Sequence, residues 1–182
     1  MLGLTSILIL VGVWLVNPPQ QAAPKPEGDS DVSSVDIELP PGQAAPESGQ
    51  PAPDFTAVTI TGETITLSAL RGQPVWLVFV ASWCGNCLAE APDVEAVANQ
   101  FTGRAHVISI YIGDDQETVE QYAAEVGLTH PQIPDPAKQL GTAYAAMGVP
   151  AHYFIDNDGI ITAIGFGTLA AEGAIQALEM MI

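Results

Sequence analysis

An uninterrupted apolar run at residues 74–81 (PVWLVFVA) constrains the fold of this chain more than any other feature. An apolar run of this length and composition is typical of a strand that is covered on both faces of its sheet. A helical pattern follows almost at once, from Cys84 to about Gln100. Together the two segments predict an α/β domain in which a buried central strand leads directly into a helix.

Periodic patterns continue on both sides of this unit. They predict a β-hairpin at 55–60 and 63–67, a buried strand at 105–112, helices at 115–126 and 136–147, strands at 151–155 and 159–164, and a closing helix at 169–181. This order combines one parallel crossover with an antiparallel strand pair. We therefore expect a central mixed sheet flanked by helices, with an extra N-terminal β-hairpin.

Composition divides the chain into three parts. Residues 1–16 (MLGLTSILILVGVWLV) carry no charged side chain, residues 17–53 contain nine of the fifteen prolines, and residues 54–182 carry the patterns above. The first part predicts a signal anchor that forms a transmembrane helix, with a cleaved secretory signal as the alternative. The second predicts a Pro-rich, acidic, flexible tether, in which only residues 32–39 have strand character. The third is the folded domain.

The charge excludes one large class of function. The chain has 21 acidic residues against four Lys and Arg, for a formal net charge of −17. So few cations cannot displace the counterions of a nucleic acid, so we expect no nucleic-acid partner. The acidity is not confined to the tether, because residues 54–182 hold fifteen acids against three cations. We expect the domain to favour basic protein partners and to bind them less tightly at high salt.

The two cysteines of the chain, Cys84 and Cys87, lie where the central strand gives way to the helix. The N-terminus of a helix lowers the pKa of a thiol placed there. An exposed first sulfur can then attack a partner's disulfide, and the second can resolve the mixed disulfide. A structural disulfide is a weaker alternative, because so short a loop contributes little entropy. Structural zinc is weaker still, because His106, His130 and His152 lack the spacing of a zinc half-site.

Residues 79–92 (FVASWCGNCLAEAP) and 148–156 (GVPAHYFID) resemble the thioredoxin superfamily, and within it the membrane-anchored TlpA/ResA-like thiol–disulfide oxidoreductases of bacteria. The resemblance covers roughly residues 51–182. It implies a thioredoxin-like fold, no cofactor and no metal. It also implies a domain held outside the cytoplasm on a single-pass N-terminal anchor in the cell membrane. Its expected partners are protein disulfide or dithiol substrates and a membrane electron donor or acceptor. Apocytochrome c, during cytochrome c maturation, is a candidate substrate.

The resemblance also implies roles for individual residues. Cys84 would be the nucleophile and Cys87 the resolving thiol of a redox-active disulfide. Pro150 would be a cis-proline that faces the cysteines. The backbone of Val149 would bond an extended substrate, with Trp83 beside it in the substrate site. One departure from the family lies between the cysteines, where Asn86 replaces the usual proline.

Two polar residues near the pair have open roles. Thioredoxin itself carries a buried Asp on the central strand, six residues before its first cysteine, and here that position is Val78. The ResA-like group carries a Glu at the place of Glu90, so Glu90 could take the proton of Cys87, or it could be a solvated helix acid. His152 replaces part of the usual sequence after the cis-proline. It could stabilise the thiolate as a cation or be an ordinary strand histidine.

Two other functions compete with thiol–disulfide exchange. The domain could be a non-catalytic thioredoxin-like binding or scaffold module, with a cysteine pair that does no chemistry. It could also be a peroxiredoxin-type peroxide reductase, although that chemistry needs Thr or Ser three residues before the peroxidatic cysteine. Here that position is Ala81. The enzyme that exchanges disulfides through Cys84 and Cys87 is the interpretation that the residues favour.

Overall fold

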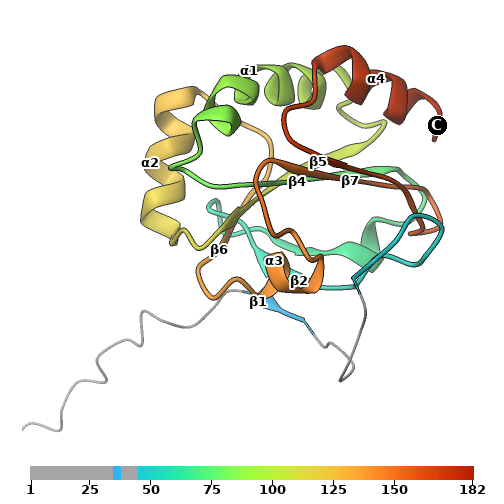
Figure 1. Cartoon of the computed structure of the whole chain (residues 1–182), viewed down its shortest axis with the longest axis horizontal. Coiled ribbons are helices and arrows are strands. Elements are labelled where there is room, and N and C mark those ends of the chain that lie inside the picture. The colour runs from blue at the N-terminus through green and yellow to red at the C-terminus, as the bar shows by residue number, and fades with distance from the viewer. Residues whose placement is uncertain (1–34, 38–44) are drawn as a thin grey trace, which may run out of the picture. The chain divides into compact units, whose positions relative to one another are not determined.

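The computed structural model describes residues 35–37 and 45–182, so the predicted anchor at 1–16 and most of the predicted tether lie outside the described residues. A five-stranded mixed sheet forms the centre of the described chain (Figure 1), with the strand order β6-β5-β4-β7-β8. β4, β5 and β6 run parallel, whereas β7 and β8 are antiparallel to their neighbours. The strands are β4 Val75–Val80, β5 His106–Ile112, β6 Gln132–Asp135, β7 Ala151–Ile155 and β8 Ile161–Phe166.

Helices cover both faces of this sheet, as predicted. They are α1 Gly85–Gln100, α2 Gln116–Val126, α3 Gln139–Ala143 and α4 Ala171–Glu179, with a short 3-10 helix at Leu67–Leu70. Figure 1 shows α1, α2 and α4 on one side of the sheet and α3 on the other. Within the described ranges, none of the helices has the length and apolar character needed to cross a membrane.

The central strand β4 explains this two-sided architecture. All six of its residues are buried, and successive side chains of a strand point to opposite faces. Leu77 and Phe79 pack with residues of α3 and the N-terminal strands, whereas Trp76 and Val78 pack with residues of α1, α2 and α4. The uninterrupted apolar run therefore supplies two cores at once.

A second, three-stranded sheet precedes β4. Its strands are β1 Val35–Asp36, β2 Thr56–Val58 and β3 Thr64–Thr66, and all of its pairings are antiparallel. β2 and β3 form the predicted hairpin, and β1 lies in the stretch noted for its strand character. Backbone bonds from Gly49 to Ile161 and from Ile161 to Gln50 also join residues of the expected tether to the edge strand β8.

One strand was not predicted. β6 lies at the other edge of the sheet and contains Pro134, and prolines are usually evidence against a strand. An edge strand tolerates proline because the backbone groups on its outer side have no neighbouring strand to bond. Here β6 pairs only with β5. The segment is nevertheless anchored, because the Ile60 N–H donates to the Gln132 carbonyl at 3.0 Å.

The predicted helix at 136–147 is much shorter in the structure. Lys138 has a left-handed backbone, with φ of 57°, and α3 begins only after it. The Asp135 carboxylate accepts the backbone N–H groups of Gln139 and Gly141, at 2.7 and 2.9 Å. A carboxylate at the end of β6 therefore fixes where the helix begins, which periodicity alone does not reveal.

Candidate active site

Cys84 and Cys87 form a disulfide at the junction of β4 and α1, with 5.2 Å between their Cα atoms. Cys84 is the N-cap of α1, and its Sγ accepts the backbone N–H of Cys87 at 3.1 Å. This N–H and the helix N-terminus would both stabilise a thiolate at Cys84 once the disulfide is reduced. The local geometry therefore favours Cys84 over Cys87 as the attacking sulfur.

The pair is less exposed than predicted. Cys84 is 6% exposed and Cys87 is 2% exposed, so the sulfurs do not stand out in an open turn. Gly85 and Asn86 between them are exposed, as expected. The surface next to the pair is formed instead by Trp83, which is 75% exposed. A substrate must therefore approach beside the indole to reach Cys84.

The loop before the cysteines is held by Asp114, which follows β5. The Asp114 carboxylate accepts the Ser82 backbone N–H at 2.6 Å and the Ser82 hydroxyl at 3.0 Å. Asp115, not Asp114, caps α2, through the Thr118 N–H. Asp114 therefore ties the end of β5 to the active-site loop. An acid two residues after a buried strand was the available signal.

The peptide bond between Val149 and Pro150 is cis, as predicted. The carbonyl oxygen of Val149 lies 3.8 Å from Cys84 Sγ, across 65 residues of sequence. Pro150 is buried, Val149 is half-buried and Met147 is exposed, so the backbone just before the proline borders the surface beside the disulfide. The structure thus brings together five of the predicted site residues, namely Trp83, Cys84, Cys87, Val149 and Pro150.

Glu90 is buried on α1, with only 4% of it exposed, so it is not the solvated acid of the alternative interpretation. Its Oε1 accepts the backbone N–H of Leu169 at 2.8 Å. Burial raises the pKa of Glu90 to about 7, although the Leu169 N–H opposes this and the nearby Asp93 adds to it. A carboxyl that titrates near neutral pH is suited to exchanging protons with a thiol.

His152 approaches Glu90 from β7. Its Nε2 lies 3.0 Å from the Gly167 carbonyl and 3.4 Å from Glu90 Oε1. Burial lowers the pKa of His152, with the Gly167 carbonyl opposing, so the ring is neutral at neutral pH. The buried ring therefore favours the interpretation of His152 as a strand histidine that faces an interior neighbour over that of a cation at the thiolate.

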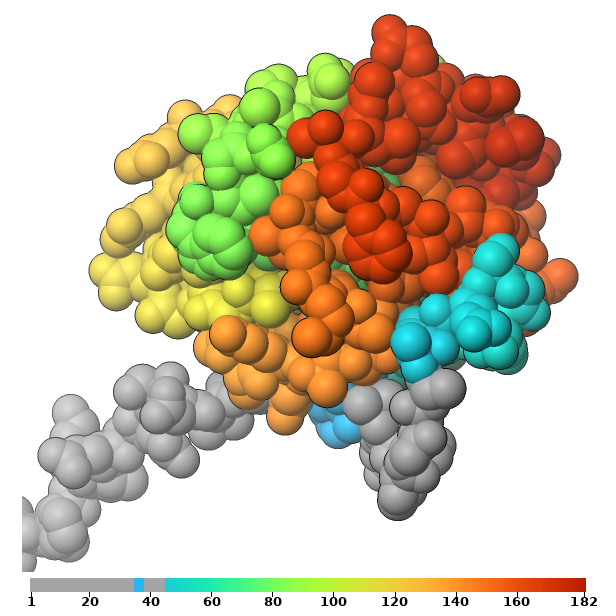
Figure 2. Space-filling view, viewed as in Figure 1, coloured from blue at the N-terminus to red at the C-terminus, as the bar shows by residue number. Residues whose placement is uncertain are grey.

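Several large apolar side chains are exposed on the segments that lead to or from the site. Trp83, Leu88, Met147 and Phe166 are all at least half exposed. Figure 2 shows the green start of α1, the orange segment before β7 and the red-orange end of β8 meeting on one face. A groove of about 470 Å³ opens beside Trp83 and Met147 and reaches Val149. Exposed apolar surface of this kind is typical of a site that binds another protein chain.

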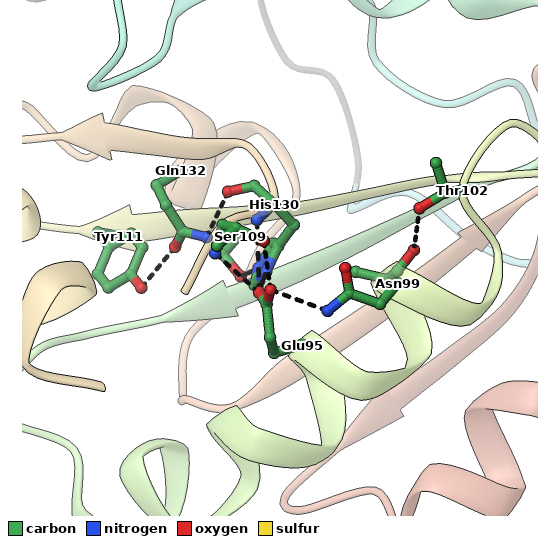
Figure 3. A network of polar contacts seen from close by, with 9 residues as sticks. Glu95, Asn99, Thr102, Ser109, Tyr111, His130 and Gln132 are labelled. Atoms are coloured by element: carbon green, nitrogen blue, oxygen red, sulfur yellow. Dashed lines mark hydrogen bonds and ion pairs between the residues drawn. The ribbon is translucent and has the colours of Figure 1, made fainter. Parts of the chain in front are cut away.

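A second polar cluster lies further along α1 (Figure 3). The Glu95 carboxylate lies 2.7 Å from Nδ1 of His130, and Nε2 of His130 lies 2.8 Å from the Ser109 hydroxyl. Because a carboxylate only accepts, Nδ1 carries the proton and the serine hydroxyl donates to Nε2. Thr129 also donates to Glu95 through its N–H and its hydroxyl.

The order of serine, histidine and acid in this cluster matches that of a hydrolytic triad. Ser109, however, is only 3% exposed and lies in the middle of β5. The groove beside His130 and Thr129 is not lined by Ser109. With its hydroxyl out of reach of a substrate, the cluster connects α1 to the segment before β6 and is structural.

We expect Glu95→Gln to lower the free energy of unfolding by about 1–3 kcal/mol, because charged hydrogen bonds to Thr129 and His130 are lost. Burial opposes ionisation, but those bonds outweigh it and lower the pKa of Glu95 from 4.5 to about 2. The native state therefore gains stability from this group above pH 4.5 and loses it as the pH falls toward 2. Urea unfolding from pH 2 to 7 should show this slope in the wild type and a weaker one in Glu95→Gln. The exposed Glu125→Gln is the control, and an equal slope in all three proteins would refute the assignment.

The fold and the site together define a class. A cysteine pair at the start of a helix, a cis-proline beside it and a mixed sheet covered on both faces make this a thioredoxin-like thiol–disulfide oxidoreductase. A family model described as the AhpC/TSA family matches residues 48–164. The chain belongs to this family, and within it is a TlpA/ResA-like thiol–disulfide oxidoreductase.

Individual relatives support this family assignment. The thioredoxin-like protein YneN of Bacillus subtilis is 30% identical over 137 residues, which cover 74% of this chain and 80% of YneN. The thiol-disulfide oxidoreductase ResA of Geobacillus thermodenitrificans is 30% identical over 132 residues, covering 72% and 76%. Among solved structures, the exposed lipoprotein thioredoxin Etrx1 of Streptococcus pneumoniae is similar with a TM-score of 0.61 and 28% identity, covering 70% of this chain and 98% of Etrx1.

Proposed function

We propose that this oxidoreductase reduces protein disulfides outside the cytoplasm while anchored to the cell membrane by residues 1–16, and that apocytochrome c is among its substrates. The observation that carries the proposal is the Val149 carbonyl, 3.8 Å from Cys84 Sγ and next to the cis peptide bond. A backbone acceptor at this position can pair with an extended chain and align its disulfide with Cys84. A protein segment, rather than a small thiol, makes use of such a group.

The exchange proceeds in two balanced steps. In the reduced protein, the Cys84 thiolate attacks one substrate sulfur, forms a mixed disulfide and releases the other substrate sulfur as a thiolate. Cys87 then loses its proton to the Glu90 carboxylate and attacks Cys84 Sγ, which releases the second substrate thiolate. Two electrons pass to the substrate and leave the Cys84–Cys87 disulfide that the structure shows. A membrane electron donor must reduce that disulfide before the next cycle.

Glu90 is suited to the second step by its place on α1. It lies three residues after Cys87, and residues at that spacing are neighbours on a helix surface. Both residues are buried, so a proton that leaves the Cys87 thiol has little access to water. With Val78 on β4, the central strand offers no acid to take it. Glu90 supplies the missing proton acceptor.

Two further observations support the location and the partner. Residues 1–16 are wholly uncharged, and the solved relative Etrx1 is described as an exposed lipoprotein. Both cysteines of the sequence are joined in the disulfide, and the anchor that we propose is the apolar segment. The acidic domain also favours a basic substrate protein.

The proposal is tested by trapping. Cys87→Ser in the full chain should stop the reaction at the mixed disulfide, because no second sulfur can resolve it. In bacterial cells that also produce a c-type cytochrome, we expect adducts with apocytochrome c in the membrane fraction, detected on non-reducing gels and by mass spectrometry.

The double variant Cys84→Ser/Cys87→Ser is the matched control and should trap nothing. Adducts found only in the cytosolic fraction would contradict the proposed location. Adducts in the membrane fraction that never include apocytochrome c would contradict the proposed substrate and leave the location supported.

A further inference from the structure

Three buried polar atoms have no hydrogen-bond partner among the described residues, namely Trp76 Nε1, Glu90 Oε2 and His152 Nδ1. The three residues lie close together. The rings of Trp76 and His152 are 5.8 Å apart between centroids, and His152 Nε2 is 3.4 Å from Glu90 Oε1. Buried polar groups are nearly always paired, so this buried polar cluster is unusual and its remaining contacts are informative.

The contacts of His152 determine which of its nitrogens carries the proton. Nε2 lies 3.0 Å from the Gly167 carbonyl, which can only accept, so Nε2 is protonated. A second proton on Nδ1 would place a charged ring in the interior, 1% exposed, with no acceptor for that N–H. His152 is therefore a fixed, neutral donor whose N–H lies beside the Glu90 carboxyl.

The register of the sheet puts His152 in a particular place. It pairs with Val78 of β4, six residues before Cys84 in the chain, and with Gly165 of β8 on its other side. Across from this strand position lies α1, whose buried face carries Cys87 and Glu90. The donor and the carboxyl thus come from two rigid elements, β7 and α1, rather than from mobile surface groups.

We propose that His152 is a positioning residue for Glu90, whose Nε2–H stabilises the Glu90 carboxylate and so sets the pH at which Glu90 can accept the proton of Cys87. No proton leaves His152 in this step: the thiol proton moves from Cys87 to Glu90, while Nε2–H stays hydrogen-bonded to the Gly167 carbonyl, with Glu90 Oε1 3.4 Å from Nε2. The inference rests on the proposed role of Glu90 in the proposed function.

Few other groups act on Glu90. The Leu169 N–H stabilises its carboxylate, the Asp93 carboxylate on the same helix opposes ionisation, and Cys87 does not titrate while it is in the disulfide. A change at His152 should therefore be seen directly in the titration of Glu90. The oxidised protein is the right sample, because the Glu90 carboxyl ionises in it whereas Cys87, held in the disulfide, does not.

The test follows the Glu90 carboxyl carbon by NMR in oxidised protein labelled with ¹³C at glutamate side chains, with the signal assigned by its loss in Glu90→Gln. We expect a midpoint near pH 7 in the wild type. His152→Phe removes the donor and should raise the midpoint by about one pH unit. His152→Gln places an amide N–H where Nε2 lies and should restore most of the wild-type midpoint.

An unchanged midpoint in folded His152→Phe would overturn the inference. If that variant does not fold, the wild type gives the answer: ¹⁵N shifts of His152 should show a neutral ring protonated on Nε2 at pH 7, and a cationic ring at that pH would overturn the inference. Neither measurement depends on turnover. If the cysteine-trapping experiment fails while the midpoint shifts, the proposed function is wrong and the contact between His152 and Glu90 stands.

Discussion

Cys84→Ser should abolish disulfide reduction by this protein, lowering turnover by on the order of 10³-fold or more, because the attacking sulfur is removed. Cys87→Ser should abolish turnover to a similar extent for a different reason. Its Cys84 can still attack, but the mixed disulfide cannot be resolved, so one equivalent of substrate thiol is released and the reaction stops. A peptide disulfide mixed with each pre-reduced variant, with no external reductant present, distinguishes the two: Cys84→Ser releases no substrate thiol and Cys87→Ser releases one equivalent. Turnover itself is compared with the wild type in a separate assay that supplies a chemical reductant, with the rate of the reductant alone subtracted.

Asn99→Ser is a matched control, because it also introduces a serine on α1, at an exposed position near the other end of the helix. It should retain full activity. Continued turnover by both cysteine variants would mean that the pair is not the reacting group. The domain would then act as a binding or scaffold module despite its fold.

Glu90→Gln should raise the stability of the folded protein and, at the same time, slow the release of substrate from the mixed disulfide. The pKa of Glu90 is raised from 4.5 to about 7, so the native state keeps a proton that the unfolded chain loses between these values. Stability therefore falls as the pH rises from 4.5 to about 7, and the full penalty remains above pH 7. Because glutamine cannot ionise, the variant should melt several degrees above the wild type at pH 8 and level with it below pH 4.5.

The same variant should release substrate from the mixed disulfide about 10²-fold more slowly at neutral pH, since it lacks the carboxylate that we propose as the proton acceptor of Cys87. Thermal unfolding across pH 4–9 and single-turnover release of a chromophoric thiol measure the two effects. Glu172→Gln on α4, an exposed position, should change neither quantity. A gain in stability without slower release would mean that the buried carboxyl does not serve the cysteines.

Much of the fold follows from local pattern. The run at 74–81 specifies a strand buried on both faces, and the cysteines directly after it specify a helix N-terminus with a reactive pair. β6 could not be predicted in this way, because it is stabilised by pairing with β5 at the edge of the sheet, where a proline such as Pro134 is tolerated. The true start of α3 depends on the Asp135 carboxylate, whose bonds to the helix backbone cross the boundary between two elements.

In the site, too, some features follow from local sequence and others depend on contacts between distant segments. The roles expected of Cys84 and Pro150 rest on short motifs, and the structure places both where those motifs indicate. The environment of Glu90 could not be decided from α1 alone, because the group that binds it is the backbone of Leu169, 79 residues further along the chain. Long-range contacts of this kind decide whether a helix acid is solvated or buried.

The two edges of the central sheet have a consequence for how the protein behaves when crowded. Exposed edge strands offer unpaired backbone groups that recruit other chains into aggregates. Here the β8 edge is engaged by residues 48–51, through bonds at Ile161 and a bridge from Pro51 to Ile160. The β6 edge carries Pro134 and is bonded by Ile60. Residues 48–51 thus protect the redox domain from edge-to-edge association, and a domain trimmed to begin at Asp54 would be exposed to it.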